Sequence, residues 1–278
     1  MNELQNIFLK EKTTAVENLH YSMAYIENET GVCAREINID SKKGDEKLVT
    51  IAMITDAHLN AEKTEHTKAL VQTMKFASFA DQTVLCGDNV ESVSSDANIA
   101  LLRENVWDVY PETITMLGNH EYFYPFDSST DALKEKINSI WPHNPDYYSK
   151  LVGDKVLVVT ADNARAVEYG NWQYYFTKEK CDFLKADIEY ARKNGYIILF
   201  FCHVGLTLLD KNLEANSEMY KLITTNADVI KGCFSGHGHE DGKAQLCASD
   251  SGISVSIPQF FLCGCCEEKG HILFINVK

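Results

Sequence analysis

The sequence contains no apolar run long enough to span a membrane. Residues 197–202 are one of its longest runs, whereas a membrane-spanning helix needs about 20 apolar residues. Residues 1–5 also lack the basic start and the apolar stretch of a secretory signal peptide. These absences predict a cytoplasmic protein that does not associate with a membrane.

Positive charge is also scarce. The chain has 26 Lys and Arg against 40 Asp and Glu, a formal net charge of −14. Proteins that bind duplex nucleic acid usually present a basic stripe to the phosphates, and none is visible here. The composition therefore disfavours a long nucleic acid as partner. It does not exclude a small anionic substrate, because a metal site would itself be cationic.

Cysteine pairs at the spacing of a zinc site are missing too. The nine cysteines are an odd number, and several lie inside apolar runs, where Cys packs as a small hydrophobe. Unpaired cysteines suit a reducing compartment. The cluster Cys263-Gly264-Cys265-Cys266 has the composition of a soft-metal site, but no second Cys/His pair stands nearby. Its role stays open.

From residue 48 onward, apolar runs that predict strands alternate with helical segments. This rhythm favours an α/β fold with largely parallel strands, and no internal repeats are seen. The predicted strands are residues 48–55, 83–86, 113–117, 156–160, 196–202, 229–234, 253–257 and 271–277. The predicted helices are residues 60–79, 97–107, 129–140, 178–193 and 217–224. Thr177 is the expected N-cap of the fourth helix, and Asn194-Gly195 its end.

The first 47 residues carry no chemical motif. Residues 4–19 have a partial apolar stripe that predicts an amphipathic helix, and residues 33–39 alternate as a strand does. We therefore predict an N-terminal extension, residues 1–47, that packs on a domain spanning residues 48–278.

Five short polar clusters stand where predicted strands end. They are Asp56-Ala57-His58, Gly87-Asp88, Gly118-Asn119-His120-Glu121, His203 and Gly236-His237-Gly238-His239. Any one of them is compatible with a turn or with a hydrogen-bonded core residue. Five together point to a single site, because ligands of α/β sheets gather at the carboxyl ends of the strands.

The side chains of these clusters are those of a two-metal hydrolytic site. Imidazole and carboxylate suit Mn, Fe or Zn, and a carboxylate is the natural bridge between two ions about 3.5–4 Å apart. An Asn oxygen can bind a cation without adding charge. The neighbouring glycines allow the backbone to turn tightly, so that the side chains point inward.

In order and approximate spacing, the five clusters resemble the calcineurin-like metallophosphoesterase superfamily. The resemblance covers residues 49–277 and fills every metal-ligand position. It implies a four-layer α/β/β/α sandwich of two facing mixed sheets flanked by helices. It also implies hydrolysis of a phosphate monoester or diester by a hydroxide that bridges two divalent transition-metal ions. Flanking residues such as Val159-Thr160-Ala161-Asp162 resemble the cyclic-nucleotide phosphodiesterase and purple-acid-phosphatase branch.

The resemblance assigns a role to each position. The implied ligands of the first ion are Asp56, His58 and His239, and those of the second are Asn119, His203 and His237. Asp88 would bridge the two ions. His120 would face the substrate, where it stabilises developing charge or protonates the leaving oxygen. Asn119, His120 and Tyr122 are the candidate substrate-binding residues.

Two glutamates are candidates for supporting roles. In the phosphoprotein-phosphatase branch, an acidic residue three positions after the bridging Asp supports the catalytic His, and Glu91 stands at that offset. An orienting carboxylate fixes the imidazole tautomer and raises its basicity. The alternative for Glu91 is a solvated loop residue. Glu121 is either a supporting residue or the cap of the following turn.

Two differences from the motifs of related proteins argue against particular branches of the superfamily. The phosphoprotein phosphatases continue with Asp-Arg-Gly after their Gly-Asp-x-Val, whereas Asp88 is followed here by Asn89-Val90-Glu91-Ser92-Val93. The arginine is therefore missing, which argues against protein phosphatase activity. Purple acid phosphatases place a Tyr ligand where Glu91 stands, so their colour is not expected.

Residues 122–148 are rich in aromatic side chains, among them Tyr122, Phe123, Trp141 and Tyr147. They either line a substrate pocket or cover the edge of a sheet, and the second interpretation is favoured. The sequence favours a small nucleotide-like phosphorylated substrate and does not indicate an oligomeric state. The alternatives are a catalytically silent metal-binding interaction module, a nuclease, or a regulatory protein that docks through the aromatic segment.

Overall fold

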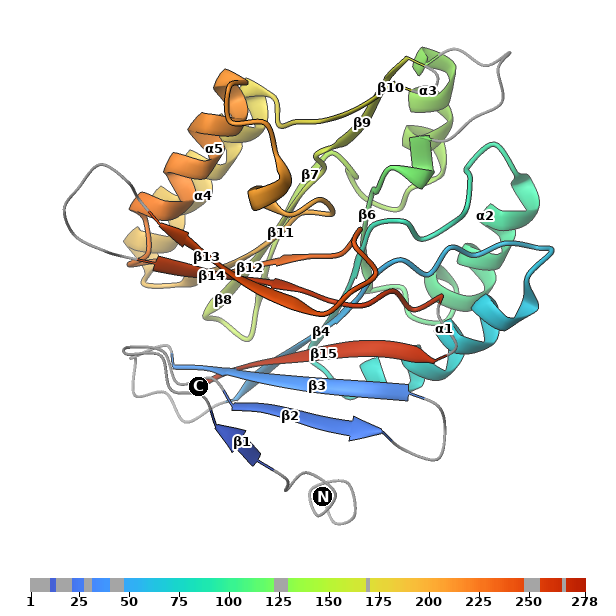
Figure 1. Ribbon diagram of the computed structural model, residues 1–278, viewed down its shortest axis with the longest axis horizontal. Helices are drawn as coiled ribbons and strands as arrows, with labels where there is room; N and C mark the ends of the chain where they lie inside the picture. Colours follow the sequence, from blue (N-terminus) through green and yellow to red (C-terminus); the bar gives the residue numbers. More distant parts are fainter. Residues whose placement is uncertain are drawn as a thin grey trace.

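Two β-sheets packed face to face form the centre of the molecule (Figure 1). The computed structural model describes residues 11–13, 22–27, 32–40, 48–122, 130–168, 171–247, 256–266 and 269–278. Within these ranges the helices lie on the two outer faces of the sheet pair (Figure 1). The predicted α/β sandwich of two mixed sheets is confirmed.

The first sheet has seven strands in the described residues and is mixed. Its order is β1 (Glu11–Thr13), β2 (Ser22–Glu27), β3 (Val32–Ile39), β15 (Gly270–Val277), β4 (Val49–Ile54), β5 (Gln82–Cys86) and β6 (Ile114–Met116). Strands β4, β5 and β6 run parallel, whereas β15 is antiparallel to β4 and parallel to β3.

The second sheet has six strands, with antiparallel partners at both edges. Its order is β13 (Gly242–Cys247), β14 (Ser256–Phe261), β12 (Ile230–Ser235), β11 (Ile197–Phe201), β8 (Val156–Ala161) and β7 (Tyr147–Val152). The four central strands are parallel. A separate ribbon pairs β9 (Ala164–Glu168) with β10 (Asn171–Tyr174).

Three apolar layers hold the sandwich together. Between the sheets, Met53 and Val84 share a core with Phe201 and Phe234. The outer face of the first sheet packs on α1 (Thr64–Ala77), α2 (Asp96–Leu102) and α3 (Thr130–Ile140). The outer face of the second sheet packs on α4 (Lys178–Asn194) and α5 (Glu214–Thr225). The central strands are buried on both faces, which is why they are apolar throughout.

Local signals set several helix ends as predicted. Thr177 caps α4 by accepting the N–H of Lys180, and Gly195 ends the helix at a left-handed φ of 69°. The predicted helix 97–107 is α2 followed by a wider π turn, Arg103–Trp107. None of the helices in the described ranges has both the length and the apolarity to cross a membrane.

The N-terminal region contributes to the first sheet. Strand β3 pairs with β15 along its whole length, from Val32 beside Gly270 to Ile39 beside Val277. The helix predicted for residues 4–19 is wrong for Glu11–Thr13, which form β1 and pair with β2. The rest of that range lies outside the described residues. The division at residue 47 stays a prediction.

Candidate metal centre

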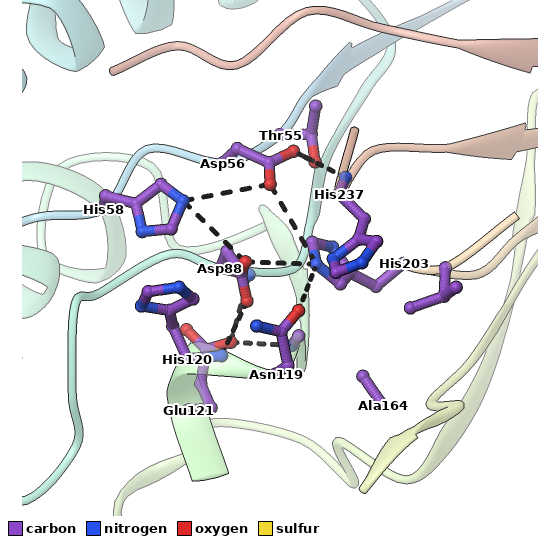
Figure 2. Close-up of polar contacts among 12 residues, drawn as sticks. Thr55, Asp56, His58, Asp88, Asn119, His120, Glu121, Ala164, His203 and His237 are labelled. Atoms are coloured by element: carbon purple, nitrogen blue, oxygen red, sulfur yellow. Dashed lines mark hydrogen bonds and ion pairs between the residues drawn. The ribbon is translucent and has the colours of Figure 1, made fainter. Parts of the chain in front are cut away.

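The five polar clusters meet where the parallel strands of both sheets end. Asp56 and His58 follow β4, Asp88 follows β5, and Asn119 and His120 follow β6. From the second sheet, His203 follows β11, and His237 and His239 follow β12. Figure 2 shows Asp88 in the middle of this cluster, with His58 on one side and His203 on the other.

The backbone is unusual at these positions. In the described part of the chain, six residues other than glycine have a left-handed φ, and five of them belong to the cluster. They are Asp56 (52°), His58 (42°), Asp88 (50°), His237 (69°) and His239 (52°). Such conformations cost about 1–3 kcal/mol each and persist where the surrounding structure enforces them. Their concentration here marks a functional site.

Close packing explains three of the glycines in the polar clusters. A Cβ on Gly87 would lie 2.5 Å from Nδ1 of His203, and one on Gly118 would lie 2.2 Å from Oδ1 of Asp88. A Cβ on Gly236 would lie 2.4 Å from Oδ2 of Asp56. Only Gly87 of these three has a left-handed φ, 88°. The predicted tight turn therefore applies to Gly87, whereas the other two allow close approach.

Asp88 occupies the central position. Its Oδ2 lies 3.2 Å from Nε2 of His203 and 3.7 Å from Nε2 of His58. Its Oδ1 accepts the backbone N–H of His120 at 2.8 Å. Asn119 completes this side, with Oδ1 3.2 Å from Nε2 of His203. One carboxylate thus faces imidazoles from both sheets.

Asp56 has one satisfied and one unsatisfied carboxylate oxygen. Its Oδ2 accepts the hydroxyl of Thr55 at 2.6 Å and the N–H of His237 at 3.0 Å. Its Oδ1 is buried and accepts no hydrogen bond from the described residues. This oxygen faces Nε2 of His239 at 3.3 Å and Nε2 of His58 at 3.9 Å. A buried anionic oxygen without a donor fits a bound cation.

The histidines also present nitrogen atoms to the same space. Nε2 of His58 and Nε2 of His239 lie 3.1 Å apart. Nδ1 of His203 lies 2.8 Å from the carbonyl oxygen of Cys86, so Nδ1 donates its proton there and Nε2 is the nitrogen directed at the carboxylates. Among the described residues, three groups have donor atoms within 4.8 Å of one another: His58, Asp88 and His120; Asp88, His203 and His237; and His58, His239 and Cys266.

Charge balance in this buried space depends on the carboxylates. Burial lowers the pKa of His203, but Asp88 and Asp56 outweigh it and raise that pKa to about 10. Burial raises the pKa of Asp88, but His203 reverses the effect and holds it below its usual range. Burial lowers the pKa of His58 to about 4, so its imidazole is neutral, as a metal ligand must be. The carboxylates of Asp56 and Asp88 therefore favour positive charge in this space. A divalent ion would supply such charge.

Glu91 lies between two histidines. Its Oε2 is 3.4 Å from Nδ1 of His58, and its Oε1 is 3.5 Å from Nδ1 of His120. The two imidazole rings meet edge to face, with centroids 4.3 Å apart. The sequence predicted Glu91 beside His120, but it gave no signal for the contact of Glu91 with His58.

Glu121 is fully buried and gathers backbone donors from two loops. It accepts the N–H of Gly118 at 2.6 Å, Asp88 at 3.0 Å, Asn89 at 2.7 Å and Val90 at 3.1 Å. Burial, with Asp88, raises its pKa to about 7, although the backbone donors oppose the rise. Glu121 therefore joins the loop that carries Asp88 to the loop that carries Asn119 and His120.

The described aromatic residues of the segment 122–148 belong mainly to the core. Tyr122, predicted to bind substrate, is 3% exposed, and its hydroxyl donates to Asp162 at 2.7 Å. Its ring therefore braces the loop from inside, away from a substrate. Trp141 and Tyr147 are also buried. Phe123, Tyr124 and Phe126 lie outside the described residues.

A tyrosine that the sequence did not single out lies beside the cluster. Tyr174, at the end of β10, is partly buried, and its ring centroid is 5.1 Å from that of His237. The strand that carries it is short, so no sequence pattern linked it to the candidate ligands.

The comparisons with known proteins agree with this geometry. The calcineurin-like phosphoesterase family matches residues 49–241. A dimetal phosphatase from Danio rerio is similar in structure, with 14% identity and a TM-score of 0.57, over 79% of this chain and 88% of that one. A putative 5'-nucleotidase from Staphylococcus aureus has 14% identity and a TM-score of 0.46, over 79% of this chain and 49% of that one. No curated protein matches the sequence.

Proposed function

Since the chain belongs to the calcineurin-like phosphoesterase family, we propose that it is a metal-dependent phosphoesterase that hydrolyses a small phosphate monoester or diester. The observation that carries this proposal is the position of Asp88. Its Oδ2 faces His203 at 3.2 Å and His58 at 3.7 Å, so one carboxylate serves two groups of donors. A shared carboxylate is what a two-metal hydrolytic site requires.

The donor groups divide into two halves around Asp88. Asp56, His58 and His239 would hold one ion, and Asn119, His203 and His237 would hold the other. Two divalent ions there, Mn, Fe or Zn, would supply Lewis acidity toward the phosphoryl group and toward water. The orphaned Oδ1 of Asp56 and the inward Nε2 of His203 support this assignment.

The exposure and the anchoring of His120 support a role for this residue on the substrate. Its backbone is anchored on Asp88, and its ring is 29% exposed. Nδ1 faces the carbonyl and the carboxylate of Glu91, at 3.3 and 3.5 Å, so Nε2 points away from Glu91. From that side of the ring His120 donates a proton to the leaving oxygen. Glu91 is the positioning residue that holds the ring.

A small nucleotide-like substrate fits the charge and the surroundings of the cluster. The net charge of −14 opposes a long polyanion. The ring of Tyr174 beside His237 offers a surface on which a base or an aryl group can stack. The proposed partner is therefore a small phosphorylated molecule.

A substrate panel tests the proposal. Protein loaded with Mn²⁺ is assayed on aryl phosphomonoesters, aryl phosphodiesters, cyclic nucleotides, nucleoside diphosphate derivatives, and single- and double-stranded DNA, with Asp88→Asn as control. We expect hydrolysis of a small ester that is lost in the variant. Metal binding without turnover on any compound would favour a silent interaction module. Turnover confined to DNA would favour a nuclease.

A further inference from the structure

The cysteine cluster that follows β14 forms one wall of the candidate metal centre. The N–H of Cys265 donates to the carbonyl of Thr55 at 2.9 Å, and the N–H of Cys266 donates to that of Asp56 at 3.1 Å. Gly264 packs so closely that a Cβ there would lie 3.2 Å from Cβ of Asp56. These contacts fix the segment against the end of β4.

The three thiols of this segment have different neighbours. Sγ of Cys263 donates to the carbonyl oxygen of His239 at 3.0 Å, and Sγ of the buried Cys265 donates to the hydroxyl of Thr73 at 3.5 Å. Cys266 is partly exposed, and its Sγ lies 3.8 Å from Nδ1 of His239. Of the three, Cys266 has its sulfur within 4.8 Å of donor nitrogens of His58 and His239.

A second observation points to a ligand at the same place. Oδ1 of Asp56 is buried, accepts no hydrogen bond from the described residues, and lies 3.3 Å from Nε2 of His239. His58 and His239 therefore have an oxygen of Asp56 on one hand and the sulfur of Cys266 on the other among their neighbours. Mixed N, O and S donors are typical of Zn²⁺, whereas Mn²⁺ favours oxygen-rich sites.

We propose that Cys266 supplies a thiolate ligand to the half of the centre formed by Asp56, His58 and His239, and that this half selects Zn²⁺ over Mn²⁺. The inference rests on the metal centre of the proposed function. The other half, around Asn119, His203 and His237, has nitrogen and oxygen donors without a sulfur in its donor group. The two halves thus differ in chemistry, and the thiolate sets the difference.

Cobalt spectroscopy tests the ligand directly. Metal-free protein is titrated with Co²⁺, and the ligand-field bands and the near-ultraviolet sulfur-to-cobalt charge-transfer band are recorded. The wild type and the matched control Cys263→Ser are expected to show both features. Cys266→Ser is expected to keep ligand-field bands and to lose the charge-transfer band.

Competition with a chromogenic chelator gives the selectivity. In Cys266→Ser, the dissociation constant of the more tightly bound Zn²⁺ is expected to rise at least about tenfold over that of the wild type. Even the loss of an indirect partner of a ligand costs about 10- to 100-fold in metal affinity. Mn²⁺ binding is expected to change less than Zn²⁺ binding. Equal losses for both ions would overturn the claim of selectivity.

A labelling experiment needs no variant and so does not depend on folding of the mutant. Iodoacetamide is applied to metal-free and Zn²⁺-loaded wild type, and modification is located by mass spectrometry. Cys266 is expected to be protected by Zn²⁺, whereas the exposed Cys247 reacts in both samples and serves as internal standard.

The outcomes separate the two proposals. Ligand-field bands without a charge-transfer band in the wild type, or a band that survives in Cys266→Ser, would overturn the role of Cys266 and leave the phosphoesterase proposal standing. Absence of any cobalt binding would contradict the metal centre itself.

Discussion

A carboxylate oxygen of Glu121 accepts the backbone N–H of Asp88 at 3.0 Å, although the two residues are 33 positions apart. The same side chain accepts three further N–H groups from the two loops. The central carboxylate of the site is therefore held by a second, fully buried carboxylate that faces the backbone and not the substrate. The loops after β5 and β6 keep their relative position because of this contact.

Glu121→Gln should destabilise the protein and disturb the site. Each oxygen of Glu121 accepts two backbone N–H groups, and the amide nitrogen cannot accept, so two buried N–H groups lose their acceptor, at a cost of about 1–3 kcal/mol each. Denaturant unfolding measures the loss, with Glu62→Gln as control because residue 62 is exposed. Equal stability of the two variants would show that Glu121 does not hold the loops.

Glu91→Gln should lower kcat and weaken metal binding together. The carboxylate faces Nδ1 of both His58 and His120, and loss of such an orienting partner typically costs about 10- to 100-fold. Kinetics at rising Mn²⁺ separate the two effects. If saturating metal restores full kcat, Glu91 acts through His58 alone, and unchanged kinetics would make it a solvated loop residue.

His120→Asn should reduce turnover by about 10²- to 10⁴-fold, the range for loss of a general acid, while metal content stays near that of the wild type. The loss should be smaller for aryl esters with good leaving groups, since these need less protonation. Metal content is measured on the same samples. An emptied metal site would instead assign His120 to the donor group that it forms with His58 and Asp88.

Gly118→Ala should weaken folding and metal binding through a steric effect. The added Cβ would meet Oδ1 of Asp88 at 2.2 Å and its backbone N at 2.4 Å, and such overpacking costs about 1–3 kcal/mol. Gly238→Ala is the matched control, because nothing lies within 4 Å of a Cβ there. Thermal unfolding compares the two, and identical shifts would refute the steric account.

Much of the fold and the identity of the site follow from local patterns. The central strands were predicted because burial on both faces makes them apolar throughout, and α4 because Thr177 and Gly195 mark its ends. The strands β7 and β13 were missed, since they lie at sheet edges and carry many exposed or partly exposed polar residues. Their pairing is decided by neighbours distant in the chain.

The residues of the candidate site likewise divide into those that the sequence predicts and those that it does not. Asp56, Asp88 and His203 could be named from sequence because each stands two residues after the end of a strand. Most partners of Glu121 and Cys266 could not, because they are distant in the chain. Glu121 reaches the loop after the neighbouring strand β5, and Cys266 lies near His58 and His239, which follow strands of different sheets. Tyr122 was predicted to bind substrate because it stands shortly after His120 in the chain, whereas its hydroxyl reaches inward to Asp162.

The central claim is a centre of two divalent ions bridged by Asp88, and metal stoichiometry tests it most directly. Metal-free protein is reconstituted with Mn²⁺ or Zn²⁺, freed of excess ion, and analysed by plasma mass spectrometry beside Asp88→Asn. We expect about two ions per chain in the wild type and a clear loss in the variant, because one carboxylate serves both ions. No bound ion in the reconstituted wild type, or full occupancy in Asp88→Asn, would contradict the account.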